Sequence, residues 1–199
     1  MSPYDENDIR ASHTVDQQIA ELQEVRLADI KMLYAQHIGN AAGELVVVGD
    51  FNADELTQAI EGSLSKLTTS IEYERIDTKA FPNVEGRHLS ILTPGKKNAF
   101  YIAAHQIPVG RLNPDYAALV VGNHILGGGS LSSRLADRIR QKDGLSYGVG
   151  SMYRAYAFED LGRIMIYAIS NPVNSPKVVK AIEEEVQRLL TDGVTEQEV

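Results

Sequence analysis

Three consecutive glycines, Gly127, Gly128 and Gly129, separate two stretches of helical periodicity and constrain the fold more than any other feature. Glycine has no Cβ, so it allows backbone conformations that end a helix. Apolar residues recur at four-residue spacing after the glycines: Leu131, Leu135 and Ile139. This spacing predicts a helix that stops at Gly144, with a strand starting directly afterwards.

Arg140 and Tyr147 flank this predicted corner between helix and strand, seven positions apart in the sequence. If the corner is tight, a guanidinium and a phenol hydroxyl converge on one ligand, and both donate hydrogen bonds to carbonyl oxygens. Two ordinary roles compete with this interpretation. Arg140 would suit the dipole at a helix C-terminus as a solvated cation, and Tyr147 would pack in the core as a strand aromatic. Spacing alone leaves the functional and the ordinary interpretations equally open.

The remaining apolar patterns predict helices and strands in an order that indicates the fold class. Helices are predicted over these ranges, the first broken near Arg26: 14–38, 52–67, 113–126 and from Ser175 onward. Strands are predicted over 44–48, 87–92, 99–107, 146–156 and 162–170, with the second and third forming a hairpin. Because strands arrive in adjacent pairs, we expect an α+β fold, a mostly antiparallel sheet with helices packed on one face.

The length and composition favour one domain. With 199 residues, 43% of them apolar, the chain can bury a substantial core. We expect a single domain over 14–192, preceded by a tail at 1–13 from an earlier segment and followed at 193–199 by the start of a truncated one. The chain would then be part of a longer protein.

Charge and cysteine content exclude several classes of function. The net charge of −8 and the scattered 19 lysines and arginines argue against binding to nucleic acid or to acidic lipid. The chain has no cysteine, so it can form no disulfide or thiolate metal site. Because such a chain is compatible with either the cytoplasm or the periplasm, its composition does not determine the compartment. No apolar run approaches the roughly 20 residues of a membrane span, so we expect a soluble chain.

The usual signatures of catalytic sites are missing. The five histidines stand apart from one another and form no His-x-x-Glu-His motif: His13, His37, His88, His105 and His124. We therefore expect no metal in this chain. The glycine triplet lacks the Lys-Ser/Thr of a phosphate loop and follows a helix, which favours a flexible corner or hinge between helices. No Gly-x-Ser-x-Gly elbow of a serine hydrolase occurs.

The segments 126–135 and 139–147, read together, resemble the signature of one known family. They are similar to the C-terminal, non-zinc-binding domain of the pitrilysin/insulinase family of zinc metallopeptidases. The segments 29–34 and 44–51, the latter reading Glu-Leu-Val-Val-Val-Gly-Asp-Phe, resemble the entry to the same domain. The resemblance covers the chain from about Thr14 to Leu190.

The resemblance implies a peptide-binding role. Family members consist of homologous α+β domains whose two halves close around an unfolded peptide. One domain holds zinc through an inverted His-x-x-Glu-His motif, and another carries an Arg and Tyr pair that contacts the peptide. Arg140 and Tyr147 match that pair in type and spacing, whereas the zinc motif has no counterpart here.

The resemblance thus predicts a substrate-binding, non-catalytic domain that is inactive alone. Its zinc-bearing partner domain would lie in the same polypeptide or in a separate one. The alternative is an inactive structural homologue that acts as a scaffold or assembly subunit. A small-molecule enzyme that binds phosphate at the glycine triplet is a third hypothesis, and it predicts nucleotide binding.

Overall fold

The computed structural model describes residues 3–39, 43–69, 71–129 and 132–199. Two compact units make up the chain, Met1–Ile76 and Asp77–Val199. Leu131, predicted on the helix after the glycine triplet, lies outside the described residues. The single domain predicted over 14–192 stays a prediction.

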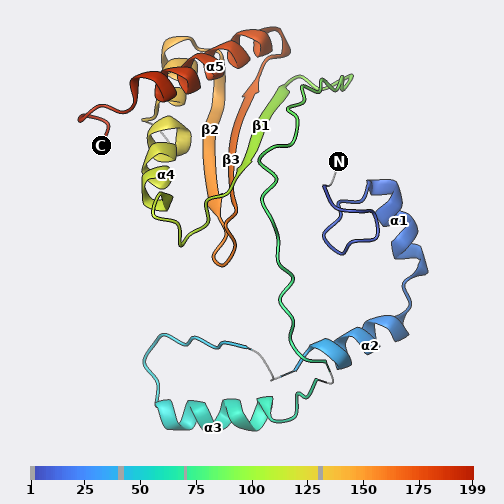
Figure 1. The fold of residues 1–199 in the computed structure, drawn as a ribbon. Helices are drawn as coiled ribbons and strands as arrows, with labels where there is room; N and C mark the ends of the chain where they lie inside the picture. Colours follow the sequence, from blue (N-terminus) through green and yellow to red (C-terminus); the bar gives the residue numbers. More distant parts are fainter. Residues whose placement is uncertain (1–2, 40–42, 70, 130–131) are drawn as a thin grey trace. The chain divides into compact units, whose positions relative to one another are not determined.

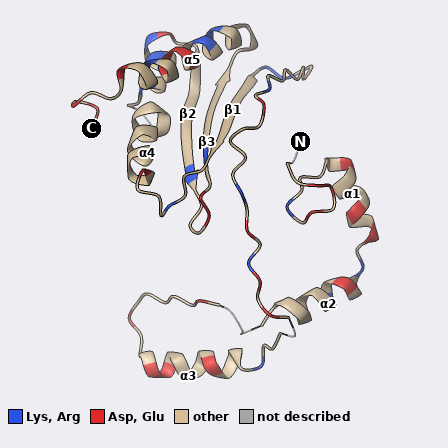
Figure 2. Cartoon of the chain, in the orientation of Figure 1, with Lys and Arg blue, Asp and Glu red and all other residues tan. Residues whose placement is uncertain are grey.

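The first unit contains three α-helices (Figure 1): α1 Val15–Glu24, α2 Leu27–His37 and α3 Ala53–Leu64. The break between α1 and α2 falls where the apolar stripe predicts it. Helices α1 and α3 carry acidic residues and no lysine or arginine (Figure 2). The negative charge of the chain is thus prominent on this unit.

Side-chain caps begin two of these helices. The Thr14 hydroxyl accepts a hydrogen bond from the Gln17 amide at 3.3 Å, and the Gln17 side chain accepts one from the Thr14 amide at 2.8 Å. Thr14 and Gln17 thus form a reciprocal capping box at the start of α1. The Asn52 side chain accepts hydrogen bonds from the amides of Asp54 and Glu55 and so caps α3.

The strands predicted at 44–48 and 87–92, and with them the hairpin, are wrong. Neither segment forms a strand in the structure, and Val48 in the first is 93% exposed. A strand is stabilised by a partner ladder and by packing of its side chains, and local propensity provides neither. The strand over 99–107 pairs with 162–170 instead.

The second unit is organised around a three-stranded antiparallel sheet (Figure 1): β1 Ala99–Ile107, β2 Ser146–Ala155 and β3 Gly162–Ser170, in the order β1-β3-β2. Both pairs are antiparallel, and β3 is central. The predicted α+β class with a mostly antiparallel sheet is confirmed.

Helices cover one face and one edge of this sheet. They comprise α4 Tyr116–Asn123, the π-helices η1 His124–Gly128 and η2 Ala136–Lys142, the short 3₁₀ helix η3 Pro172–Asn174, and α5 Ser175–Asp192. Helix η1 continues α4, and both contact β2, whereas η2 and α5 pack on the sheet face. None of the helices in the described residues has the length and apolar character that crossing a bilayer requires.

The core lies between η2, α5 and the sheet. Leu135 and Ile139 are completely buried, and their four-residue spacing places both on the side of the helix that faces the sheet. They pack with Ala168 of β3 and Val178 of α5. Burying side chains of this size contributes about 1.5–3 kcal/mol each, so these contacts hold η2 in place beside the corner that follows it.

Candidate functional site

Arg140 and Tyr147 lie together at the surface. The Cζ atom of Arg140 is 4.5 Å from the centroid of the Tyr147 ring, within the range of a cation–π contact. Tyr147 is 83% exposed, and Arg140 is half-buried. The interpretation of Tyr147 as a core aromatic is therefore wrong, and both side chains remain accessible to a ligand.

A tight corner brings the two residues together. Helix η2 ends at Lys142, and Gly144 adopts a positive φ of 61°, which glycine tolerates without a steric penalty. The Leu145 amide donates a hydrogen bond to the Ile139 carbonyl at 2.9 Å, closing the turn against the helix. The predicted change from helix to strand within a few residues is confirmed.

A β-bulge frees Tyr147 from the ladder. Ser146 pairs with Ser170 and Gly148 pairs with Ile169, so Tyr147 is the extra residue of β2. The Ser146 hydroxyl lies 2.6 Å from the Ile169 carbonyl oxygen and fixes the start of the strand. Bulges redirect side chains in this way, which explains how a strand residue comes to lie beside the end of the preceding helix.

The glycine triplet permits close packing. A Cβ on Gly127 would lie 2.6 Å from the Ser151 amide nitrogen of β2 and 2.8 Å from the Leu135 side chain. A Cβ on Gly129 would meet the Ser132 carbonyl oxygen at 2.6 Å, and one on Gly128 the Asn123 side chain at 2.8 Å. None of the three has a positive φ. The triplet therefore lets η1 approach β2, and the predicted hinge role stays a prediction.

The sequence patterns did not predict a buried ion pair beside η2. Arg134, whose side chain is almost completely buried, donates from Nε and Nη2 to the two Glu198 carboxylate oxygens at 2.7 and 2.8 Å. Its Nη2 also donates to the Gly193 carbonyl at 2.7 Å. The segment 193–199, predicted to start a following element, is thus fastened to the base of η2.

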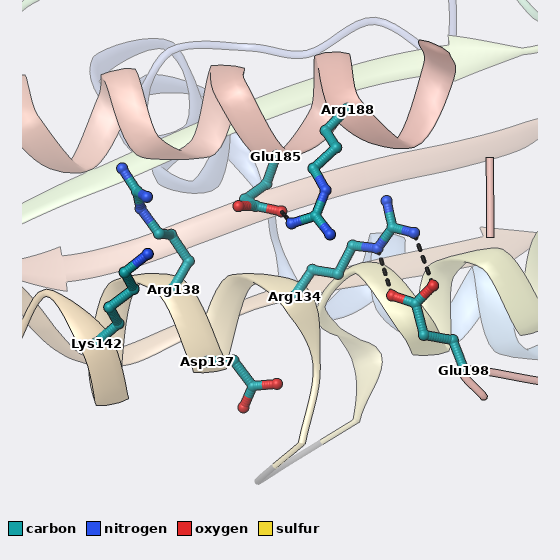
Figure 3. Close-up of a pocket in the computed structure, with 7 residues that line it drawn as sticks. All are labelled: Arg134, Asp137, Arg138, Lys142, Glu185, Arg188 and Glu198. Carbon is teal, nitrogen blue, oxygen red and sulfur yellow. Dashed lines mark hydrogen bonds and ion pairs between the residues drawn. The ribbon is translucent and has the colours of Figure 1, made fainter. Parts of the chain in front are cut away.

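This ion pair belongs to a charged cavity of about 270 Å³ between η2, α5 and the C-terminal residues (Figure 3). The cavity is lined by four cations and three carboxylates: Arg134, Arg138, Lys142, Arg188, Asp137, Glu185 and Glu198. The hydrogen bonds from Arg134 hold the pKa of Glu198 at about 2, well below its usual range. Opposite charges thus compensate one another within the cluster.

The histidines do not assemble a metal centre. Among residues 3–39, 43–69, 71–129 and 132–199, no group of three or more His, Asp or Glu side chains is placed to hold a metal ion. His105 lies within β1, and His13 pairs with Glu21 at 2.5 Å in the first unit. The donor set on the described residues does not fit a zinc ion.

Comparison with known families identifies the chain. Residues 24–199 match the family described as the peptidase M16 inactive domain. The chain belongs to this family. The segments 126–135 and 139–147 resemble the non-zinc-binding domain of pitrilysin/insulinase peptidases, and the match confirms this resemblance.

Curated relatives of the M16 chain are bacterial. This chain is 37% identical over 81 residues to the uncharacterized zinc protease YmxG of Bacillus subtilis, and the match covers 41% of this chain and 19% of that protein. It is 26% identical over 187 residues to the non-peptidase homolog YmxG of Helicobacter pylori, covering 89% of this chain and 40% of the relative. The chain therefore spans less than half the length of these relatives.

Solved structures confirm the M16 fold. The chain matches the peptidase M16 inactive domain from Pseudomonas fluorescens with a TM-score of 0.65 and 26% identity, over 88% of this chain and 41% of that one. It matches a protease from Helicobacter pylori with a TM-score of 0.71 and 18% identity, over 90% of this chain and 43% of that one. The second match concerns the fold alone.

Proposed function

We propose that this chain is the substrate-binding, non-catalytic domain of a zinc metalloendopeptidase, and that Arg140 and Tyr147 hold the peptide. The observation that supports this role is the contact of 4.5 Å between two hydrogen-bond donors at one corner, the half-buried Arg140 and the exposed Tyr147. The family match supports the same assignment, because it names an inactive domain of a peptidase family.

The chemistry of the pair suits a peptide backbone. A guanidinium and a phenol hydroxyl donate hydrogen bonds to carbonyl oxygens, which every peptide presents whatever its side chains. The cation–π contact restrains both groups before the ligand arrives, so less conformational entropy is lost on binding. Such preorganised donors also stabilise negative charge that develops on a carbonyl oxygen during hydrolysis.

The zinc ion belongs to a separate domain in this proposal, because the described residues offer no fitting set of ligands. That domain would lie in the same polypeptide or in a partner, and the greater length of the relatives leaves room for it. The role of this chain is then to orient the peptide toward a reaction centre that it does not itself contain.

A scaffold or assembly role is the second candidate function. It is supported by the name of the Helicobacter pylori relative, a non-peptidase homolog that matches 89% of this chain. A scaffold requires the fold and its surfaces, and it does not require donors at positions 140 and 147. The two candidates therefore differ in the effect of substitutions at this pair.

The test is peptide hydrolysis by the complete protein with its zinc-bearing domain. Arg140→Ala and Tyr147→Phe should each lower kcat/KM, by roughly 10²- to 10³-fold where the donor acts on the developing oxyanion. Tyr153→Phe is the matched control, since the Tyr153 hydroxyl donates to the Val109 carbonyl within the fold. Hydrolysis by both variants at the rate of the unaltered protein would favour the scaffold.

A further inference from the structure

The face of the sheet opposite η2 and α5 is exposed and has a regular order. Ile166 and Ala168 of β3 face the helices, so the residues between and beside them face outward. The register of the three strands places these outward residues in four rows: Phe100 with Ile169 and Gly148, Ile102 with Tyr167 and Gly150, Ala104 with Met165 and Met152, and Gln106 with Arg163 and Arg154.

Three of these rows are apolar. Phe100 is 62% exposed and Ile102 is 52% exposed, and Met152 and Ile169 are exposed as well. On β2, two of the rows contain glycine, and a Cβ on Gly150 would lie 3.0 Å from the Tyr167 hydroxyl. The Tyr167 ring therefore reaches over β2, where the same Cβ would also lie 3.1 Å from the Gly127 carbonyl oxygen of η1, and Gly150 is buried. The exposed apolar surface of this face lies on Phe100, Ile102, Met152 and Ile169, and it begins in the row next to Tyr147.

The fourth row is cationic. Arg154 and Arg163 are directly opposed across β2 and β3, and both are exposed. In Figure 2, basic segments lie on both strands at the end of the sheet near the turn that joins them. Directly opposed side chains have Cβ atoms about 4.5–5.5 Å apart, and like charges in such a pair destabilise the sheet.

No carboxylate of the described residues compensates this pair through an ion pair with either arginine. The nearby turn carries Glu159 and Asp160, and neither forms an ion pair with these arginines. The opposed arginines are thus the one row of this face whose side chains repel each other, and an anion between them would remove the repulsion.

We propose that Arg154 and Arg163 bind a carboxylate of an extended peptide. The backbone of the same peptide is held by Arg140 and Tyr147. The chain is then selective for peptides with an apolar stretch and an acidic end. The inference rests on the proposed function. From Tyr147 to Arg154 the strand advances seven residues, about 23 Å at 3.3 Å per residue. A peptide of about seven residues spans this distance.

The experiment measures the affinity of the full 199-residue chain for three fluorescein-labelled peptides of about seven residues with the same apolar sequence. One ends in Glu with an amidated C-terminus, one ends in Gln with a free C-terminal carboxylate, and one ends in Gln with an amide. Wild type should bind at least one of the charged peptides more tightly than the neutral one, about fivefold for each arginine that contacts the carboxylate. The charged peptide that is preferred identifies the side chain or the chain end as the ligand.

Variants at the pair test the assignment. Arg154→Gln and Arg163→Gln combined should abolish the preference and leave the neutral peptide bound as before, and raising the salt concentration should weaken the preference in wild type. Lys180→Gln, on the exposed side of α5, removes a cation elsewhere and should change nothing.

Equal binding of all three peptides by wild type would overturn the inference while leaving the proposed function intact. A preference that survives the double substitution would overturn it equally. If Arg140→Ala weakens the binding of none of the peptides, the proposed function is contradicted, and the inference with it.

Discussion

Arg134, two residues before η2, and Glu198 near the C-terminus form a bidentate ion pair across 64 positions of the sequence. The Arg134 guanidinium also binds the Gly193 carbonyl, so one buried side chain holds two points of the last seven residues. Helix η2 ends in the corner that positions Arg140 and Tyr147. The ion pair is therefore part of the support for the candidate site.

Glu198→Gln should lower the free energy of unfolding by about 2 kcal/mol, because hydrogen bonds to a charged group contribute about 1.5–3 kcal/mol and Arg134 would remain buried without its counterion. Urea unfolding of the chain measures the change. Glu196→Gln is the control, since Glu196 is exposed on the same segment. Equal stabilities of the two variants would contradict the supporting role of Glu198.

The contribution of Glu198 to stability should depend on pH. Arg134 lowers the pKa of Glu198 from 4.5 to about 2, so the folded protein binds this proton less readily than the unfolded chain. The stabilisation is then complete above about pH 4.5 and is lost as the pH falls toward about 2. Unfolding curves of wild type and Glu198→Gln should converge across this window, and a constant difference would contradict the assignment.

Gly127→Ala should destabilise the second unit by about 1–3 kcal/mol, the usual cost of an added methyl group in a packed contact. The new Cβ would lie 2.6 Å from the Ser151 amide nitrogen, so η1 must move away from β2. Gly122→Ala in α4 is the matched control. A Cβ there meets nothing within 4 Å, and the change should stabilise the helix by up to about 1 kcal/mol. Equal effects of the two substitutions would exclude close packing as the role of Gly127.

Local patterns in the sequence predicted the parts of the fold that depend on neighbouring residues. The spacing of Leu135 and Ile139 predicted a buried helix face, and the break in the apolar stripe near Arg26 predicted the division between α1 and α2. Such features require only residues three or four positions apart. The corner that brings Arg140 to Tyr147 belongs to the same class, because both residues adjoin one turn.

Long-range pairing was not predictable from these patterns. The segment 44–48 has the valines of a strand and forms none, because strand formation depends on a partner that propensity does not identify. The bulge at Tyr147 follows from its register with β3, and the partner of Arg134 lies at the far end of the chain. Nothing in the sequence near either residue indicates these partners.

Binding of a labelled apolar peptide to the 199-residue chain tests the proposed role of the Arg140 and Tyr147 pair most directly. Affinity is to be measured by fluorescence anisotropy for wild type, Arg140→Ala, Tyr147→Phe and the double variant. We predict that each single substitution weakens binding and that their free-energy effects are not additive, because the two groups touch each other and share one ligand. Affinities of all three variants equal to that of wild type would contradict the account.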